Sequence, residues 1–423
     1  MFRVVRVGNK EFKIDPETNF WGVGGDRQLE DLYAKVKDRI LGEMREFRFQ
    51  TDIILLYVNP NDACNACCAY CYLPQKVKKR ARSMSFAQLE ALVIKAKAYF
   101  SNKDVKGSII FHGTEPLLVK DRLFAIIEKD RDDVHFGLQT NGLLLSEHDA
   151  AFIKKYGINI GLSLDSPFEK ANDALRGNGH FGKVSKAIDW FDGYKGLNVV
   201  TTITRENVTH LSAMVRFLHK KKVRLCLMNP VRGTQAGARD LRPDCGKLAK
   251  EFIQAVEEAI RLTKEGQRIV IGDFANILLG IVAPTARMMM CDISPCGGGR
   301  RFFSVTADGS CYPCGEFIGM EEFRGGNVFT DSMENILGSE HFASVRQRRV
   351  EDIHDCRECL LRNVCGAPCP AEIYSTDGTM HAKSAYCNFY QDIARHAMEV
   401  ICRDDVGSVI RKSALQETHN LET

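Results

Sequence analysis

Six short apolar runs, each followed by a more polar segment, occupy residues 51–229 of this 423-residue chain. The segments between them, such as 86–100 and 211–222, carry apolar residues at three- and four-residue spacing, which indicates amphipathic helices. This alternation predicts parallel strands joined by right-handed crossovers, as an open sheet or a partial barrel. The expected strands are 52–58, 107–111, 134–140, 158–164, 197–203 and 223–229.

The flanking segments differ from this pattern and suggest further parts. Residues 1–50 predict a short hairpin and a charged helix, ahead of a strand–helix core at 51–284 whose last part (246–280) is rich in helix. Residues 285–402 hold ten of the sixteen cysteines, many glycines and few long helical patterns, which predicts a domain held by metal. The segment 403–423 is expected to be a polar, loosely ordered tail.

Composition narrows the setting of these cysteines. The N-terminus lacks an apolar signal core and no run of about 20 apolar residues occurs, so a cytoplasmic protein without a membrane span is expected. Thiols stay reduced there, and clustered cysteines indicate metal ligands rather than disulfides. The net charge of +4 is too small to indicate a nucleic-acid partner.

The loop NPNDACNACCAYCYLP follows the first predicted strand and presents Cys64, Cys68 and Cys71 in a C-x3-C-x2-C spacing. Three thiolates around a [4Fe–4S] cluster leave one iron open, as catalytic metal sites often do. Cys67 leaves an alternative open, because four cysteines in one loop also suit zinc or a closed cluster.

The motifs that follow give this loop a family resemblance. Tyr70 before the last cysteine, FHGTEPLL (111–118), LQTNG (138–142) and GLSLDSP (161–167) come in the order seen in the radical SAM superfamily, whose cluster cleaves S-adenosylmethionine (AdoMet) to a radical. The resemblance implies a partial (β/α)6 barrel of the TIM type. It places the following residues in the AdoMet site: Tyr70, Gly113, Thr114, Glu115, Ser163, Asp165 and Arg176.

Within this set, the resemblance directs Gly113 and Glu115 toward the methionyl amine of AdoMet, Ser163 toward its ribose or carboxylate, and Arg176 toward its carboxylate. Thr114 departs from the family pattern, which has a second glycine at that position.

The cysteine-rich C-terminal segment resembles the SPASM extension of radical SAM peptide maturases. That resemblance implies two auxiliary [4Fe–4S] clusters, three clusters in all. One would be held by Cys291, Cys296, Cys314 and Cys369, the other by Cys356, Cys359, Cys365 and Cys387. Zinc is the alternative metal, since C-x2-C pairs are common in zinc ribbons. Whether Cys311, three residues before Cys314, is a ligand stays open.

The resemblance implies an AdoMet-dependent oxidoreductase that modifies a ribosomally made precursor peptide, reduced by a flavodoxin or ferredoxin. We expect a thioether or carbon crosslink as its product, with an auxiliary cluster taking the second electron. Formylglycine formation, as in sulfatase maturases, is the alternative; there Glu316 would replace an aspartate, with its register shifted by one. A metal-stabilised binding or electron-transfer protein without catalysis is a third possibility. The hairpin at the N-terminus either offers an edge strand to a leader peptide or caps the sheet.

Overall fold

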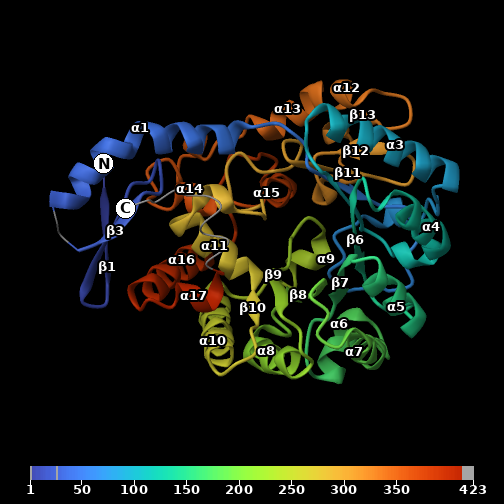
Figure 1. Cartoon of the computed structure of the whole chain (residues 1–423), viewed down its shortest axis with the longest axis horizontal. Helices are drawn as coiled ribbons and strands as arrows, with labels where there is room; N and C mark the ends of the chain where they lie inside the picture. The colour runs from blue at the N-terminus through green and yellow to red at the C-terminus, as the bar shows by residue number, and fades with distance from the viewer. Residues whose placement is uncertain (1, 25–26, 412–423) are drawn as a thin grey trace.

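The computed structural model describes residues 2–24 and 27–411, and Figure 1 shows its arrangement. The predicted strand–helix core is present as a curved parallel sheet with helices around it (Figure 1). Its six strands lie in sequence order, each hydrogen-bonded to the next. They are β4 (Leu55–Val58), β5 (Ser108–Phe111), β6 (His135–Thr140), β7 (Asn159–Ser163), β8 (Leu197–Ile203) and β9 (Leu225–Pro230). The partial barrel expected from the sequence is therefore confirmed.

The crossover helices bury one face each against this sheet. In α3 (Phe86–Asn102), Leu89, Leu92, Val93 and Ala96 are buried at helical spacing, and Ser85 begins the helix with a capping box. The others are α4 (Lys120–Asp130), α5 (Glu147–Lys155), α6 (Glu169–Arg176), α7 (His180–Phe191), α8 (Leu211–Lys220) and α10 (Cys245–Lys264), with short turns at α2 (Gln75–Lys78) and α9 (Ala236–Arg239).

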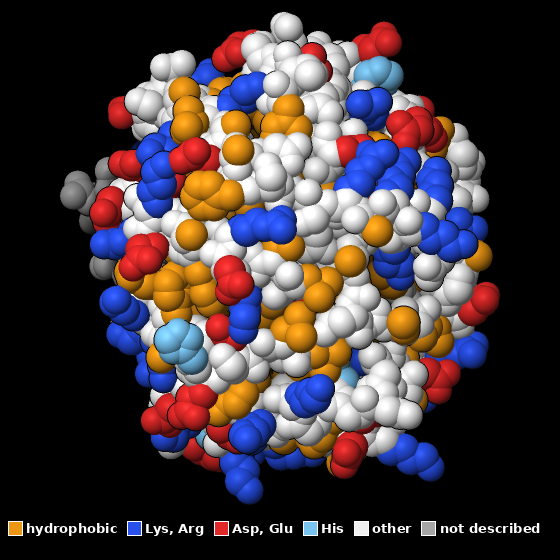
Figure 2. Space-filling model, turned by 90° about the vertical axis from the view of Figure 1, so that its right-hand side faces the viewer, with side chains coloured by type: hydrophobic (Ala, Val, Ile, Leu, Met, Phe, Trp, Pro, Cys, Tyr) orange, Lys and Arg blue, Asp and Glu red, His pale blue; other side chains and the backbone are white. Residues whose placement is uncertain are grey.

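The outer face over α3, α4 and α5 mixes positive and negative side chains, as Figure 2 shows for this side of the molecule. Ion pairs join neighbouring helices there, with Lys97 on α3 bonded to Asp130 at 2.8 Å and Lys120 on α4 bonded to Asp149 at 2.9 Å. No helix among the described residues is long and apolar enough to cross a membrane.

The cysteine-rich part continues the main sheet rather than forming a sheet of its own. Strand β11 (Phe302–Val305) pairs in parallel with β4, and β12 (Ser310–Tyr312) and β13 (Gly326–Asn327) follow antiparallel. At the other edge, β10 (Val270–Ile271) extends β9 and leads into α11 (Gly272–Val282). The segment expected to be separate is thereby joined to the barrel by backbone hydrogen bonds.

The N-terminal hairpin of β1 (Arg3–Val7) and β2 (Lys10–Ile14) gains a third strand, β3 (Trp21–Val23). Helix α1 (Arg27–Phe49) then runs along the cysteine-rich part (Figure 1). Near its end, Arg48 donates to the Ser294 carbonyl at 2.6 Å and pairs with Glu351 at 2.7 Å. The extension is thus anchored on the C-terminal part of the chain.

Short helices build the rest of the C-terminal part: α12 (Met333–Gly338), α13 (Glu340–Arg346), α14 (Arg362–Cys365), α15 (Pro370–Asp377), α16 (Cys387–Cys402) and α17 (Val406–Val409). The start of the expected loose tail is folded, since Val409 and Ile410 are buried and Arg268 donates to the Val409 carbonyl at 2.7 Å. The remainder of that tail, from residue 412, lies outside the described residues.

Gly366 is a point of close approach between two cysteine-bearing loops. Its φ is +65°, and a Cβ there would lie 2.4–2.8 Å from the backbone of Ile293. The left-handed conformation costs a residue with a Cβ about 1–2 kcal/mol, and the clash adds to that cost. We therefore expect Gly366→Ala to lower the unfolding midpoint strongly in a thermal melt.

Gly378 supplies the matched control, because its φ is +69° and a Cβ added there would meet no atom within 4 Å. Gly378→Ala should cost only the conformational term, about 1–2 kcal/mol. Equal shifts for the two variants would contradict a close approach at Gly366.

Candidate functional site

The loop after β4 gathers three of its four cysteines. Cys64, Cys68 and Cys71 lie close enough to influence one another electrostatically, whereas the Cys67 thiol is exposed. Burial raises the pKa of Cys68 to about 11, and both neighbouring thiols add to that shift. The loop is fixed at Ala69, whose N–H donates to the Leu175 carbonyl at 3.0 Å.

The turn after β5 packs directly against this loop. Gly113 has a φ of +100°, and a Cβ there would lie 2.1–2.3 Å from the Asn59 side chain, so only glycine fits. Thr114, at the position where the family pattern has glycine, is accommodated because its hydroxyl donates to the Asn61 carbonyl. Threonine at this position thus adds a hydrogen bond between the turn after β5 and the loop after β4.

Glu115 is fully buried, and its carboxylate joins the ends of two strands. It accepts hydrogen bonds from the Thr140 hydroxyl at 2.6 Å, the Asn141 N–H at 2.9 Å and the Leu117 N–H at 3.0 Å. Burial raises the pKa of Glu115, and these three donors oppose the shift. Both carboxylate oxygens are therefore engaged by the protein.

Asn141, within the LQTNG segment, is a site residue that the sequence reasoning did not single out. Its side-chain amide donates to Asn65 Oδ1 at 2.8 Å and approaches Cys64 Sγ at 3.7 Å. Its position in the sequence could have identified it, because a polar residue directly after a buried strand lies at the end of the barrel where active sites are found.

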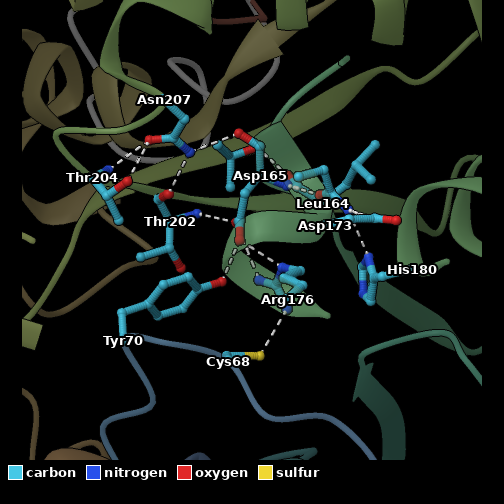
Figure 3. A network of polar contacts seen from close by, with 12 residues as sticks. Cys68, Tyr70, Leu164, Asp165, Asp173, Arg176, His180, Thr202, Thr204 and Asn207 are labelled. Atoms are coloured by element: carbon cyan, nitrogen blue, oxygen red, sulfur yellow. Dashed lines mark hydrogen bonds and ion pairs between the residues drawn. The ribbon is translucent and has the colours of Figure 1, made fainter. Parts of the chain in front are cut away.

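Asp165 and Arg176 form a buried ion pair beneath the cysteine loop (Figure 3). Arg176 donates from Nε and Nη2 to the two carboxylate oxygens at 2.7 and 3.2 Å, while the Thr202 N–H and the Tyr70 hydroxyl also donate to Asp165. Burial alone would lower the pKa of Arg176, but the Asp165 carboxylate raises it above its ordinary value.

The remaining guanidinium nitrogen of Arg176, Nη1, points to Cys68 Sγ at 3.8 Å. Arg176 therefore links the Asp165 carboxylate to the three-cysteine loop, and Tyr70 lies with its ring 5.5 Å from the guanidinium. Ser163, at the end of β7, is half-buried, and its hydroxyl makes no hydrogen bond to a described residue.

The two other predicted cysteine sets also assemble. Thiols of the first set, Cys291, Cys296, Cys314 and Cys369, interact electrostatically with one another, and burial raises the pKa of Cys369 to about 12. Those of the second set line a single cavity together with Leu361 and Tyr390; they are Cys356, Cys359, Cys365 and Cys387.

The remaining cysteines have other surroundings. Cys226 on β9 and Cys311 on β12 are fully buried in the core, and Cys311 donates to the Gly309 carbonyl at 3.4 Å. The described electrostatic neighbours of Cys311 are Asp331, Lys95 and Arg324 and include no thiol, in contrast to those of Cys314. Cys245, at the start of α10, is an electrostatic neighbour of Cys387.

Buried arginines surround the two C-terminal sets. The described hydrogen bonds of Arg287, Arg300 and Arg348 all go to backbone carbonyl oxygens, which leaves each positive charge without a directly bonded carboxylate. A buried cation requires a nearby anion. Thiolate-ligated iron–sulfur clusters are anionic, so these residues fit such groups. No set of three or more His, Cys, Asp or Glu among the described residues is arranged to hold a single metal ion.

Polar and aromatic side chains lie between the three-cysteine loop and the first C-terminal set. Tyr57, His112 and Tyr72 form a row with ring centroids 5.3 and 6.3 Å apart, and Tyr57 neighbours Cys291 and Cys314 electrostatically. The Tyr72 hydroxyl and His112 Nδ1 are buried and have no hydrogen-bond partner among the described residues. Both polar atoms are thus left without a partner inside the described part of the protein.

Glu316 lies beside this row. The Thr234 hydroxyl donates to its carboxylate at 3.0 Å, and its electrostatic neighbours include Arg232, Tyr72 and Cys314. Burial raises the pKa of Glu316 to about 7, while Arg232 and Thr234 oppose the shift. The carboxylate is therefore next to both a cysteine set and the unpartnered Tyr72 hydroxyl.

Three neighbouring cysteines in the loop after the first strand of a partial barrel are typical of the class of AdoMet-cleaving iron–sulfur enzymes. Comparisons agree with this: residues 58–218 match the model of the radical SAM superfamily, and residues 296–360 match SPASM, an iron–sulfur cluster-binding domain.

Similar proteins match most or all of the chain. An uncharacterised protein of Archaeoglobus fulgidus is 48% identical over 422 residues, 100% of both chains. The cysteine-type anaerobic sulfatase-maturating enzyme of Clostridium perfringens is 24% identical over 362 residues, 81% of this chain and 95% of its own. The AdoMet-bound structure of anSMEcpe superposes with a TM-score of 0.72 at 21% identity, covering 87% of this chain and 99% of that one.

The chain belongs to the radical SAM superfamily and carries a SPASM domain. It is an AdoMet-dependent iron–sulfur enzyme, which excludes the non-catalytic alternative.

The two adjacent cysteines of the first loop allow a sharp test of its ligands. Cys68→Ala should lose the iron of this site and reduce the formation of 5′-deoxyadenosine from AdoMet under dithionite to background, because one of three ligands is removed. Cys67→Ala, which removes only an exposed thiol, should keep both. Iron analysis and chromatography of the nucleoside measure this, and retention of AdoMet cleavage in Cys68→Ala would refute the ligand assignment.

Proposed function

We propose that this enzyme crosslinks a ribosomally made precursor peptide, forming a thioether or a carbon bond. The observation that carries the proposal is the position of Glu316, which is an electrostatic neighbour of Cys314 in the first C-terminal set and of Tyr72, the residue after Cys71. When bound, the cofactors supply a 5′-deoxyadenosyl radical for hydrogen abstraction and an acceptor for the second electron. A base at that place serves the remaining requirement, which is to take a proton.

The role of Glu316 as a base follows from the proton that the crosslinking reaction releases. Closing a thioether on a carbon radical releases the thiol proton and one electron, so a base and an electron acceptor are needed together. Glu316 takes the proton, and Thr234 and Arg232 orient its carboxylate. Tyr72 and His112, with their free polar atoms, position the peptide.

The AdoMet site would use the residues around the first loop. Ser163 offers a free hydroxyl, Arg176 the positive charge that it holds beside Cys68, and Gly113 a backbone without a side chain. Glu115 and Asp165, whose oxygens are engaged by protein donors, would act mainly by holding these groups in place.

A leader segment of the peptide could dock at the N-terminal extension. Strand β1 is an outer strand of the three-stranded sheet, so it offers a backbone edge for strand addition. A cap on the sheet with no partner is the alternative, and peptide binding to a variant lacking residues 1–24 would separate them.

We further propose three [4Fe–4S] clusters, held by the three cysteine sets, with a flavodoxin or ferredoxin as reductant. Anaerobic reconstitution should then give about twelve iron atoms per chain, four per cubane. Metal analysis with Mössbauer spectroscopy measures this. About four irons together with zinc would contradict the auxiliary clusters while leaving AdoMet cleavage intact.

Formylglycine formation is the second candidate, favoured by the same carboxylate, since a sulfatase-maturating enzyme is among the similar proteins. The two products differ chemically, because formylglycine carries an aldehyde that reacts with hydrazides and a crosslink does not. Coexpression with short peptides encoded beside the gene, followed by mass spectrometry with and without hydrazide, distinguishes them.

Glu316→Gln tests the proposed base in either reaction. We expect peptide product to form about 10²–10⁴-fold more slowly, because general-base assistance is lost, while 5′-deoxyadenosine still forms. Glu340→Gln, at an exposed carboxylate on α13, is the control and should behave as the unmodified enzyme. An unchanged product rate in Glu316→Gln would remove this residue from the reaction.

A further inference from the structure

Arg348 lies at the junction of the two C-terminal cysteine sets. Its side chain is 1% exposed and donates to three backbone carbonyls: Met380 at 2.7 Å, Gly366 at 3.3 Å and Ala367 at 2.8 Å. Gly366 and Ala367 belong to the short stretch between Cys365 and Cys369. The guanidinium therefore binds the backbone that connects a ligand of one set to a ligand of the other.

The backbone of Arg348 is tied to the first set as well. Ser294, between Cys291 and Cys296, donates from its hydroxyl to the Arg348 carbonyl at 3.2 Å and accepts from the Val350 N–H at 2.7 Å. Gly366 in turn touches the backbone of Ile293. These contacts fix the guanidinium relative to both loops.

The pKa of Arg348 likewise depends on thiols of both C-terminal sets. Burial lowers the pKa of Arg348, and four thiols oppose that shift, two from each set: Cys296, Cys369, Cys356 and Cys365. Its described hydrogen bonds reach no carboxylate, so its counter-charge must come from the cysteine sets.

Two further buried arginines have a simpler placement. The burial effect on Arg300 is opposed by Cys296 of the first set, and that on Arg287 by the Asp292 carboxylate first and then by Cys365 of the second set. All three guanidiniums bond to backbone carbonyls, which makes Arg300 and Arg287 matched single-site comparisons for Arg348.

We propose that Arg348 is a positioning residue that serves as a shared counter-cation for both auxiliary clusters and raises both of their reduction potentials. This inference rests on the proposed cluster ligands. Reduction adds one negative charge to a cluster, so a fixed cation nearby stabilises the reduced state. A cation held between two sites does so for each and favours electron transfer between them.

Potentiometric titration of the reconstituted enzyme, followed by EPR, measures the two potentials. Variants lacking one cysteine of either set assign each signal. Arg348→Met should lower both potentials, whereas Arg348→Lys, which keeps the charge and three donors, should restore them toward the original values. Arg300→Met should lower only the potential of the first set, and Arg287→Met only that of the second.

The outcomes separate this inference from the proposed function. With about eight auxiliary irons present per chain, unchanged potentials in Arg348→Met, or a shift at only one set, would overturn the shared role while the clusters stand. If Arg348→Met loses iron and Arg348→Lys retains it, the positive charge is required and the inference is supported. Loss of iron in both would show a packing role only. Absence of iron from the sets in the unmodified enzyme would instead refute the cluster proposal.

Discussion

Gathering eleven thiols into three small groups requires positive charge beside them, because a cysteine binds metal as thiolate. The structure supplies that charge from inside the fold. Arg176 approaches the first loop, and Arg287, Arg300 and Arg348 surround the other two sets with their donors fixed on backbone carbonyls. Backbone carbonyls hold a guanidinium in place without neutralising it. The C-terminal part therefore carries buried positive charge that fits anionic clusters, with the charge on Arg287 opposed by Asp292 as well.

Charged side chains also support the loop that holds Cys64, Cys68 and Cys71. There, single carboxylates each accept several hydrogen bonds. Asp165 accepts hydrogen bonds from Arg176, Tyr70 and the Thr202 N–H, so one carboxylate joins helix α6, the loop after β4 and strand β8. Glu115 joins the turn after β5 to the end of β6 in the same way. Removing water from these carboxylates is costly, and the donors around them offset that cost. The site is rigid because its supporting charges are fully bonded.

The sequence predicted what local patterns determine. The six parallel strands and their order follow from apolar runs separated by helical periodicity, and the three cysteine groups were expected from spacing and resemblance. It did not predict that β11, β12 and β13 extend the barrel sheet. These strands are two to four residues long, and the one that joins the barrel, β11, pairs with β4 more than 200 residues earlier in the chain.

The sequence also did not predict which polar residues are buried or which partners they have. Nothing near Arg348 in the sequence distinguishes it from Arg346 or Arg349, because burial and the opposing thiols come from distant loops. Arg176 was expected from resemblance, but its pairing with Asp165 was not, since eleven residues and a turn separate them. Such partners become visible only when the loops are folded against each other.

The pairing of β4 with β11 bears on how a substrate would reach both the three-cysteine loop and the first C-terminal set. The loop that would generate the radical leaves β4 at Val58, and β11 leads through one hairpin to Cys314 of the first auxiliary set. The two cysteine-bearing segments thus follow β4 and β12 of one hydrogen-bonded sheet, with only β11 between these strands. Their separation is a property of strand spacing and register rather than of loop motion. On the proposed function, the substrate and not a protein loop would have to move its reacting side chain between the two segments.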